Sequence, residues 1–215
     1  MAGIVAALLA PLYFATNQIM DSRGVTVWDP MTSLDAAIPF IAWSVLFYHS
    51  LYFLFYPLPL YAMPDNIRAR KEMIICGQGL MVLCVVSCTF FVLLPAEVHI
   101  RSEAIDGIAT NPGWYDSMFE WLWKFDSPFN AWPSLHVSQA GLITLFAIRW
   151  WQNKPVLQWS IGILWVLMTI SILTTKQHFL WDLITALILL SIVWKWQIQP
   201  GLMKLEEPTA DELPS

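Results

Sequence analysis

The sequence predicts an all-α polytopic membrane protein folded as a bundle of six transmembrane helices. Hydrophobic residues fill 57% of its 215 positions and charged residues only 13%, against roughly 25% charged in a soluble domain. Thirteen tryptophans suit a chain with many residues at the membrane interface. Six apolar stretches approach the ~20 residues that a spanning helix needs. No nucleic-acid partner is expected.

The apolar stretches predict where the spans lie. The first, residues 1–20, contains Pro11 and Asn17, so it is either a retained span or a re-entrant segment, and no Lys or Arg marks it as a signal peptide. The others are residues 38–61, 73–94, 135–151, 156–174 and 179–196. Short connections join the last three, which predicts antiparallel neighbours.

Lys and Arg placement predicts the orientation. With both termini cytoplasmic, seven basic residues lie inside and four outside, and the basic cluster at residues 68–71 contributes most of the difference.

The chain then divides into a membrane segment with an outer loop (1–35), the main membrane domain (36–198) and an acidic, solvated cytoplasmic tail (199–215). The long loop, residues 95–133, lies outside, and its aromatic stretch 114–125 predicts a short helix that lies in the headgroup plane or caps the bundle.

Two ionisable residues open the last span, and intramembrane ionisable residues are functional candidates by default. On a helix, His178 and Asp182 would share one face, because they are four residues apart. The carboxylate would then fix the tautomer of the ring and leave the other nitrogen as a nucleophile. The helix N-terminus there favours a bound anion. The alternative is a structural His–Asp pair that tethers the helix end.

A second polar group opens the fourth span. Ser134 stands directly before an apolar run, which is typical of an N-cap residue. In the alternative interpretation, its hydroxyl and the amides after it hold a phosphate oxygen, and His136 acts as a general acid in the same pocket. Taken alone, the pattern favours an ordinary cap beside an interfacial histidine.

Two cations complete the candidate site on the outer side. Arg101 lies in the long loop and Lys176 lies two residues before His178. In a pocket without metal they would neutralise the charge of a transferring phosphoryl group, although both are also suited to interface snorkelling. A metal site is not predicted, because the spacing of His99, His136 and the His–Asp pair matches no compact metal motif.

The remaining unusual residues are interpreted as structural. His49 is predicted to be a packed, hydrogen-bonded histidine and Arg149 an anchor at the inner end of the fourth span. The three cysteines, in a single apolar stretch without a CxxC pattern, are predicted to be small buried hydrophobes.

Two motifs give the chain a family resemblance. Pro-Ser-Leu-His at 133–136 and His-x3-Asp at 178–182 resemble the type 2 phosphatidic acid phosphatase superfamily, whose members carry Pro-Ser-Gly-His and Ser-Arg-x5-His-x3-Asp elements on a six-helix core. The wording around them, Phe-Asn-Ala-Trp-Pro-Ser-Leu-His-Val at 129–137 and Thr-Lys-Gln-His-Phe at 175–179, resembles the inositol phosphorylceramide synthase-like (inositolphosphotransferase-like) branch. The resemblance covers about residues 36–198 and implies that this is the catalytic domain.

The resemblance implies a role for each matching residue. His178 would form a phosphohistidine with Asp182 as its orienting partner, His136 would exchange protons with the leaving group and acceptor, Ser134 would hold a phosphate oxygen, and Arg101 would stand for the arginine of the first family element. Three family positions differ, since Leu94, Ser102 and Ile172 replace a lysine, a proline and an arginine. Lys176 is the candidate for the missing charge.

The expected function is therefore a metal-independent, cofactor-free lipid phosphatase or phospho-headgroup transferase. Its partners would be a lipid phosphate in the bilayer and, for a transferase, an alcohol or lipid acceptor. The site would face the non-cytoplasmic side of the membrane (plasma or inner membrane in a bacterium). Two alternatives remain open: a transporter or channel with a His/Asp relay at its rim, and a catalytically inactive member of the family.

Overall fold

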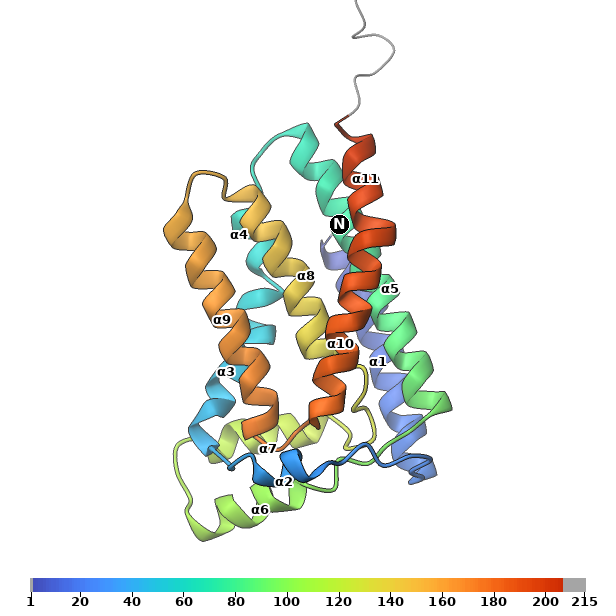
Figure 1. Cartoon of the computed structure of the whole chain (residues 1–215), viewed down its shortest axis with the longest axis vertical. Coiled ribbons are helices and arrows are strands. Elements are labelled where there is room, and N and C mark those ends of the chain that lie inside the picture. Colours follow the sequence, from blue (N-terminus) through green and yellow to red (C-terminus); the bar gives the residue numbers. More distant parts are fainter. Residues whose placement is uncertain (1, 207–215) are drawn as a thin grey trace, which may run out of the picture.

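A computed structural model describes the backbone of residues 2–206 and the side chains of residues 10–206. Within that part the fold is all-α, with one isolated bridge between Ala96 and Asn130. The long helices run along one axis (Figure 1). They are α1 (Ala2–Arg23), α5 (Ile67–Leu93), α8 (Leu135–Trp150), α9 (Pro155–Thr174) and α10 (Leu180–Val193), which continues through η3 (Trp194–Ile198) into α11 (Gln199–Lys204).

The membrane class is supported by length and composition. Three helical segments of the described chain are long and apolar enough to cross a bilayer: α5, α9 and the continuous helix from α10 to α11. With 16 residues, α8 is shorter than a typical span. The chain is therefore suited to integration into a membrane, whereas the count of six spans stays a prediction.

The predicted stretch 38–61 is not one continuous helix. It consists of η1 (Ala42–Ser44), α3 (Val45–Ser50), the π-helical η2 (Leu51–Phe55) and α4 (Leu58–Ala62). Proline explains the last interruption, because Pro57 and Pro59 have no amide hydrogen to donate within a helix. The wider π-helical turn of η2 changes the direction of the side chains beside α8.

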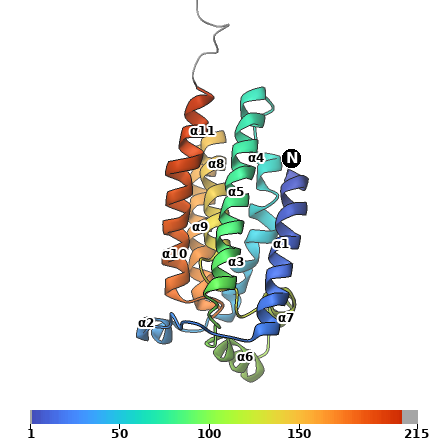
Figure 2. The same ribbon diagram turned by 90° about the vertical axis from the view of Figure 1, so that its right-hand side faces the viewer.

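Short helices cover one end of the bundle. In Figures 1 and 2, α2 (Ser33–Ala37), α6 (Arg101–Thr110) and α7 (Asp116–Phe125) lie across the end where α8 and α10 begin. The aromatic stretch 114–125 thus contains a helix, as its sequence predicted; its position in the headgroup plane stays a prediction. In Figure 2, α1 runs beside α5.

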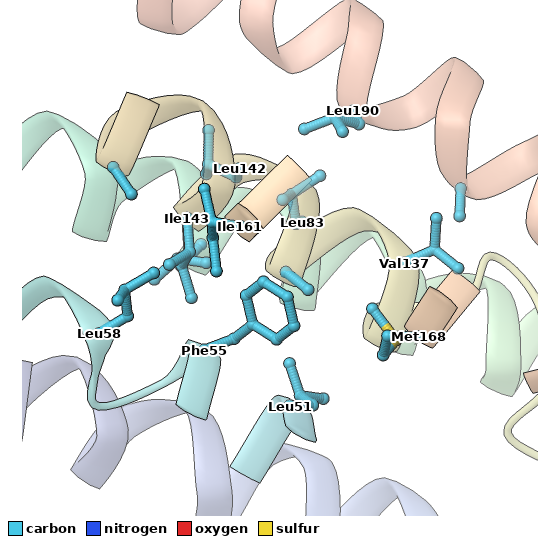
Figure 3. Packing of buried hydrophobic residues seen from close by; sticks show 14 of the residues in the cluster. Leu51, Phe55, Leu58, Leu83, Val137, Leu142, Ile143, Ile161, Met168 and Leu190 are labelled. Atoms are coloured by element: carbon cyan, nitrogen blue, oxygen red, sulfur yellow. The ribbon is translucent and has the colours of Figure 1, made fainter. Parts of the chain in front are cut away.

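The bundle core is apolar and closely packed. Figure 3 shows the ring of Phe55 beside Leu51 of the same element, η2, and near Ile143 of α8. Two glycines allow helices to approach closely, since a Cβ on Gly79 would lie 2.8 Å from Leu142 and one on Gly141 would lie 2.6 Å from Leu190. Small residues at such contacts are the usual means of packing membrane helices.

A charged cluster ties α11 to the opposite end of the bundle. Glu72 accepts hydrogen bonds from Arg149 at 3.0 Å and from the indole of Trp150 at 2.8 Å. Glu206 pairs with Arg149 at 2.8 Å and with Arg68 at 2.7 Å. The last helix extends to Lys204, past the predicted domain boundary at residue 198. Residues 207–215 of the predicted acidic tail lie outside the described part of the chain.

Candidate active site

The connection between α9 and α10 places His178 at the covered end of the bundle. The amides of Lys176 and Gln177 donate back to the carbonyls of Leu173 and Ile172, the hydrogen bonds of a Schellman motif. Lys176 takes the left-handed conformation that this motif requires, with a φ of 58°. A further bond from the His178 amide to the Ile172 carbonyl, 3.1 Å long, fixes the backbone of the histidine directly over the end of α9.

The hydrogen bonds of His178 determine its tautomer. Its Nδ1 lies 3.1 Å from Oδ2 of Asp182 and 3.1 Å from the carbonyl oxygen of Ala131. A carbonyl oxygen only accepts hydrogen bonds, so Nδ1 carries the proton. Nε2 is buried and has no hydrogen-bond partner among the described residues. In the neutral ring, the unshared electron pair is then on Nε2, the arrangement that a nucleophile requires.

The start of α10 is already occupied by carboxylates. The Leu180 amide donates to Oδ1 of Asp35 at 2.6 Å, and the Phe179 amide donates to Oδ2 of Asp182 at 2.9 Å. The expectation that this helix N-terminus binds a substrate anion therefore finds no support in the geometry. His178 also precedes the helix, so Asp182 reaches back to it from the first turn instead of sharing a helical face with it.

Ser134 precedes α8 but does not cap it with its side chain. Its hydroxyl oxygen is buried and has no partner among the described residues, and α8 has no side-chain cap at all. The backbone of Ser134 is held by two hydrogen bonds. Its amide donates to the Asp182 carbonyl at 3.2 Å, and its carbonyl accepts from the Ser138 hydroxyl at 3.0 Å. The hydroxyl and the first amides of α8 are consequently free to bind an anion.

His136 lies beside His178. Their ring centroids are 5.6 Å apart and the rings are inclined at 65°. The ring of Tyr48 packs on His136 with 4.3 Å between centroids, and the hydroxyl of Tyr52 lies 3.1 Å from Nε2 of His136. The structure therefore brings together the two histidines that were predicted to act together, although 42 positions separate them in the chain.

Arg101 is connected to the histidines through other side chains. Its Nη1 donates to the Asp126 carbonyl at 2.9 Å, and its Nη2 lies 3.7 Å from Oδ2 of Asp126. The same carboxylate accepts hydrogen bonds from the hydroxyl of Tyr48, at 3.2 Å, and from that of Tyr13. Nε of Arg101 is buried and unpartnered among the described residues. The guanidinium thus lies behind Tyr48, and its Nε–H is available as a donor.

Lys176 makes a tether in this structure. Its buried ammonium pairs with Glu103 of α6 at 2.8 Å and donates to the Asp35 carbonyl at 3.1 Å. These contacts hold α2 and α6 against the α9–α10 connection. These contacts use two of the three hydrogen-bond donors of the ammonium.

An elongated apolar cavity leads to His136. It has a volume of about 440 Å³, within the usual range for small-molecule sites. It is lined by α1, η2, α4, α5, α7 and α8, and by Tyr56 directly after η2. On α8 the lining residues run from Leu135 to Ile143, and on α5 from Cys84 to Met73. The cavity therefore extends from the histidine along the bundle axis between apolar helices.

Other candidates have structural positions. His49 is buried, with Nδ1 3.0 Å from the Val45 carbonyl. Arg149 lies in the charged cluster at the opposite end, and the three cysteines are free and buried. No three His, Cys, Asp or Glu side chains in the described part of the chain are grouped as metal ligands would be.

Sequence reasoning missed several polar residues around the histidines. Asp126 and Asp35 are both buried carboxylates next to apolar segments, a signal that was available in the sequence. Tyr48 and Tyr52 carried no such signal, because aromatic residues are common in any membrane helix. Their contacts with His136 depend on the direction in which side chains point around η2.

The fold and this site define a helical membrane protein with three features at one end of its bundle. They are a His–Asp pair, a second histidine, and a serine whose hydroxyl has no partner among the described residues. A model of the PAP2 superfamily matches residues 20–196, most of the chain. The chain belongs to the PAP2 superfamily. Membership supports an enzyme with phosphatase or phosphotransferase activity in general. Comparisons with curated proteins and with solved structures gave no match.

Proposed function

We propose that this protein is a membrane-embedded lipid phosphatase or phospho-headgroup transferase that works through a phosphohistidine at His178. The observation that carries the proposal is the hydrogen-bonding pattern of this ring. Two acceptors hold the proton on Nδ1, and the buried Nε2 has no partner in the described chain. A structural His–Asp tether would not need the second ring nitrogen to be unpartnered and beside another histidine.

The reaction would proceed in two displacements. Nε2 of His178 attacks phosphorus, the bond from phosphorus to the lipid oxygen breaks, and His136 protonates the departing alcohol. Water or a second alcohol then gives its proton to His136 and attacks the phosphohistidine. The phosphorus–nitrogen bond breaks, which restores neutral His178. The 5.6 Å between the two ring centroids supports such shared work on one phosphoryl group.

Charge on the phosphoryl oxygens would be stabilised mainly at the start of α8. The Ser134 hydroxyl and the uncapped amides of that helix supply donors, and Arg101 supplies positive charge from behind Tyr48. Lys176 contributes less directly, because its ammonium is paired with Glu103. We also propose that the chain belongs to the inositol phosphorylceramide synthase-like branch of the superfamily, because residues 129–137 and 175–179 resemble the motifs of that branch.

A lipid substrate is supported by the cavity beside His136, whose walls are almost wholly apolar. A transporter with a His/Asp relay is less well supported, since α10 continues from Asp182 without another ionisable residue until Lys195.

The test is turnover by the purified full chain in detergent, with labelled lipid phosphates and phosphodiesters, in the presence and absence of alcohol acceptors. Release of inorganic phosphate would identify a phosphatase, and a labelled new phosphodiester a transferase. EDTA should leave either activity intact. Absence of both products, with no label on His178, would contradict the proposal.

A further inference from the structure

A pair of polar side chains lies within the apolar cavity, one helical turn beyond His136. The hydroxyl of Tyr56 donates to Oε1 of Gln139 at 2.5 Å, and both residues line the cavity. Gln139 is only 2% exposed. Its amide nitrogen makes no hydrogen bond with the described residues and is not fully enclosed, so a ligand in the cavity can reach it. Polar groups buried in apolar surroundings are costly unless they are hydrogen-bonded, so an unused donor at this position points to a ligand.

The pair repeats the contact that Tyr52 makes with His136. His136 and Gln139 are three residues apart on α8 and share a face, so Gln139 lies about 4.5 Å further along the helix axis. Tyr52 and Tyr56 are four residues apart around η2, and each hydroxyl reaches the α8 side chain opposite to it. Two tyrosine contacts therefore follow one another along the cavity, the first at the histidine and the second one turn deeper.

The second contact has the chemistry of a neutral hydrogen-bonding site. The Gln139 amide nitrogen donates, while the Tyr56 hydroxyl oxygen and the Gln139 carbonyl oxygen have acceptor capacity left. The cavity walls around them are apolar, including Leu80 and Ile143. A second phosphate or an ammonium group would find no opposite charge there, whereas a hydroxyl or an amide would both donate and accept.

From this arrangement we infer that Tyr56 and Gln139 form a specificity site for a hydroxyl or amide group on the lipid, within a few bonds of the phosphate ester. The inference rests on the proposed function, which places the phosphorus between His136 and His178. Lipid phosphates with such a group near the ester would then be preferred over plain alkyl or isoprenoid phosphates. A site that hydrogen-bonds a substrate group rejects the analogue without it, because its own polar atoms remain unpaired.

The test uses two matched pairs of substrates with the purified full chain in detergent. One pair is a 1-acyl-glycerol 3-phosphate and its analogue with hydrogen in place of the 2-hydroxyl; the other is an N-acyl sphingoid 1-phosphate and its analogue with an ester in place of the amide. In at least one pair, we expect wild-type kcat/KM to be about 10-fold or more higher for the lipid with the group. Which pair responds identifies the hydroxyl or the amide.

Two variants separate recognition from a structural role. Gln139→Leu, with Tyr56→Phe as a second variant, should remove the preference by lowering kcat/KM for the preferred lipid and leave its analogue unchanged. Equal wild-type turnover within both pairs would overturn the inference while the proposed function stands, as would an equal loss for both lipids in the variants. Absence of any turnover or labelling of His178, with monoesters and diesters alike, would overturn the proposed function and this inference with it.

Discussion

Nδ1 of His178 lies 3.1 Å from Oδ2 of Asp182, and the same carboxylate oxygen accepts the Phe179 amide at 2.9 Å. Asp182 thus holds the histidine ring and the backbone at the start of α10 together. Both residues are almost fully buried, at 3% and 0% exposed. A change at Asp182 therefore affects both the histidine ring and the backbone at the start of α10.

His178→Ala should remove nearly all turnover, because the proposed nucleophile is absent. With labelled substrate, acid-labile and base-stable phosphate should appear on the wild-type chain and not on this variant. Turnover that survives the substitution would end the phosphohistidine mechanism.

Asp182→Asn should keep the fold and lower kcat. The same change in the aspartate of a serine-protease triad costs ~10⁴-fold through the wrong tautomer. Here the Ala131 carbonyl still accepts from Nδ1, so we expect a smaller loss, on the order of 10²–10³-fold. Rapid-quench measurement of phosphoenzyme formation distinguishes slower attack from misfolding, since a folded variant still reaches full labelling.

Ser134→Ala and Ser138→Ala form a matched pair. The Ser134 hydroxyl has no partner in the described chain, so its loss should change the free energy of unfolding by less than about 0.5 kcal/mol and lower kcat/KM by about 10²-fold. The Ser138 hydroxyl donates to the Ser134 carbonyl, so its loss should cost about 1 kcal/mol of stability and leave catalysis close to wild type. The reverse pattern would make Ser134 an ordinary structural residue.

The placement of the two motifs was largely predictable from the sequence. Short connections before and after α9 require α8 and α10 to begin at the same end of the bundle, which brings His136 to His178. The orientation of Lys176 was not predictable, because it depends on Glu103 in the long loop, far away in sequence. The break of the 38–61 stretch was signalled by Pro57, but the π-helical turn that aims Tyr52 and Tyr56 at α8 leaves no local sequence pattern.

Glu103→Gln tests whether Lys176 contacts the substrate. The change leaves the ammonium without its carboxylate, and since Glu103 is 46% exposed, we expect a loss of stability of up to about 1 kcal/mol. We also expect KM for the lipid phosphate to fall, because the released ammonium is then available to the anion. An unchanged KM would restrict Lys176 to its tethering role, and Lys176→Met should then lower stability without a separate effect on KM.

The pairs of Glu206 should make stability depend on pH. Its hydrogen bond and charge interaction with Arg149, with a further contribution from Arg68, lower the pKa of this carboxyl below its ordinary value. A lowered folded-state pKa stabilises the fold above the ordinary carboxyl pKa, and the stabilisation is lost as the pH falls through the folded-state value. The unfolding temperature of wild type should therefore exceed that of Glu206→Gln at pH 7 and converge with it in acid. A constant difference across this range would show that the pair does not titrate as proposed.

The last prediction concerns the membrane sides of the two ends of the bundle. The site, α6 and α7 lie at one end, while the basic cluster 68–71 and the α8–α9 connection lie at the other (Figure 1). Single cysteines should therefore label from opposite sides, in a background where Cys76, Cys84 and Cys88 are replaced by alanine. Asn111 is an exposed position at the site end; at the other end we choose Gln152, because Asn153 has a φ of 67° that disfavours cysteine.

Positive charge predicts that the basic end is cytoplasmic, so an impermeant maleimide added outside intact cells should label the Asn111 position and spare Gln152. A permeant maleimide should label both and serves as the control. Labelling of both by the impermeant reagent would contradict the span count, and labelling of Gln152 alone would reverse the orientation and place the site on the cytoplasmic side.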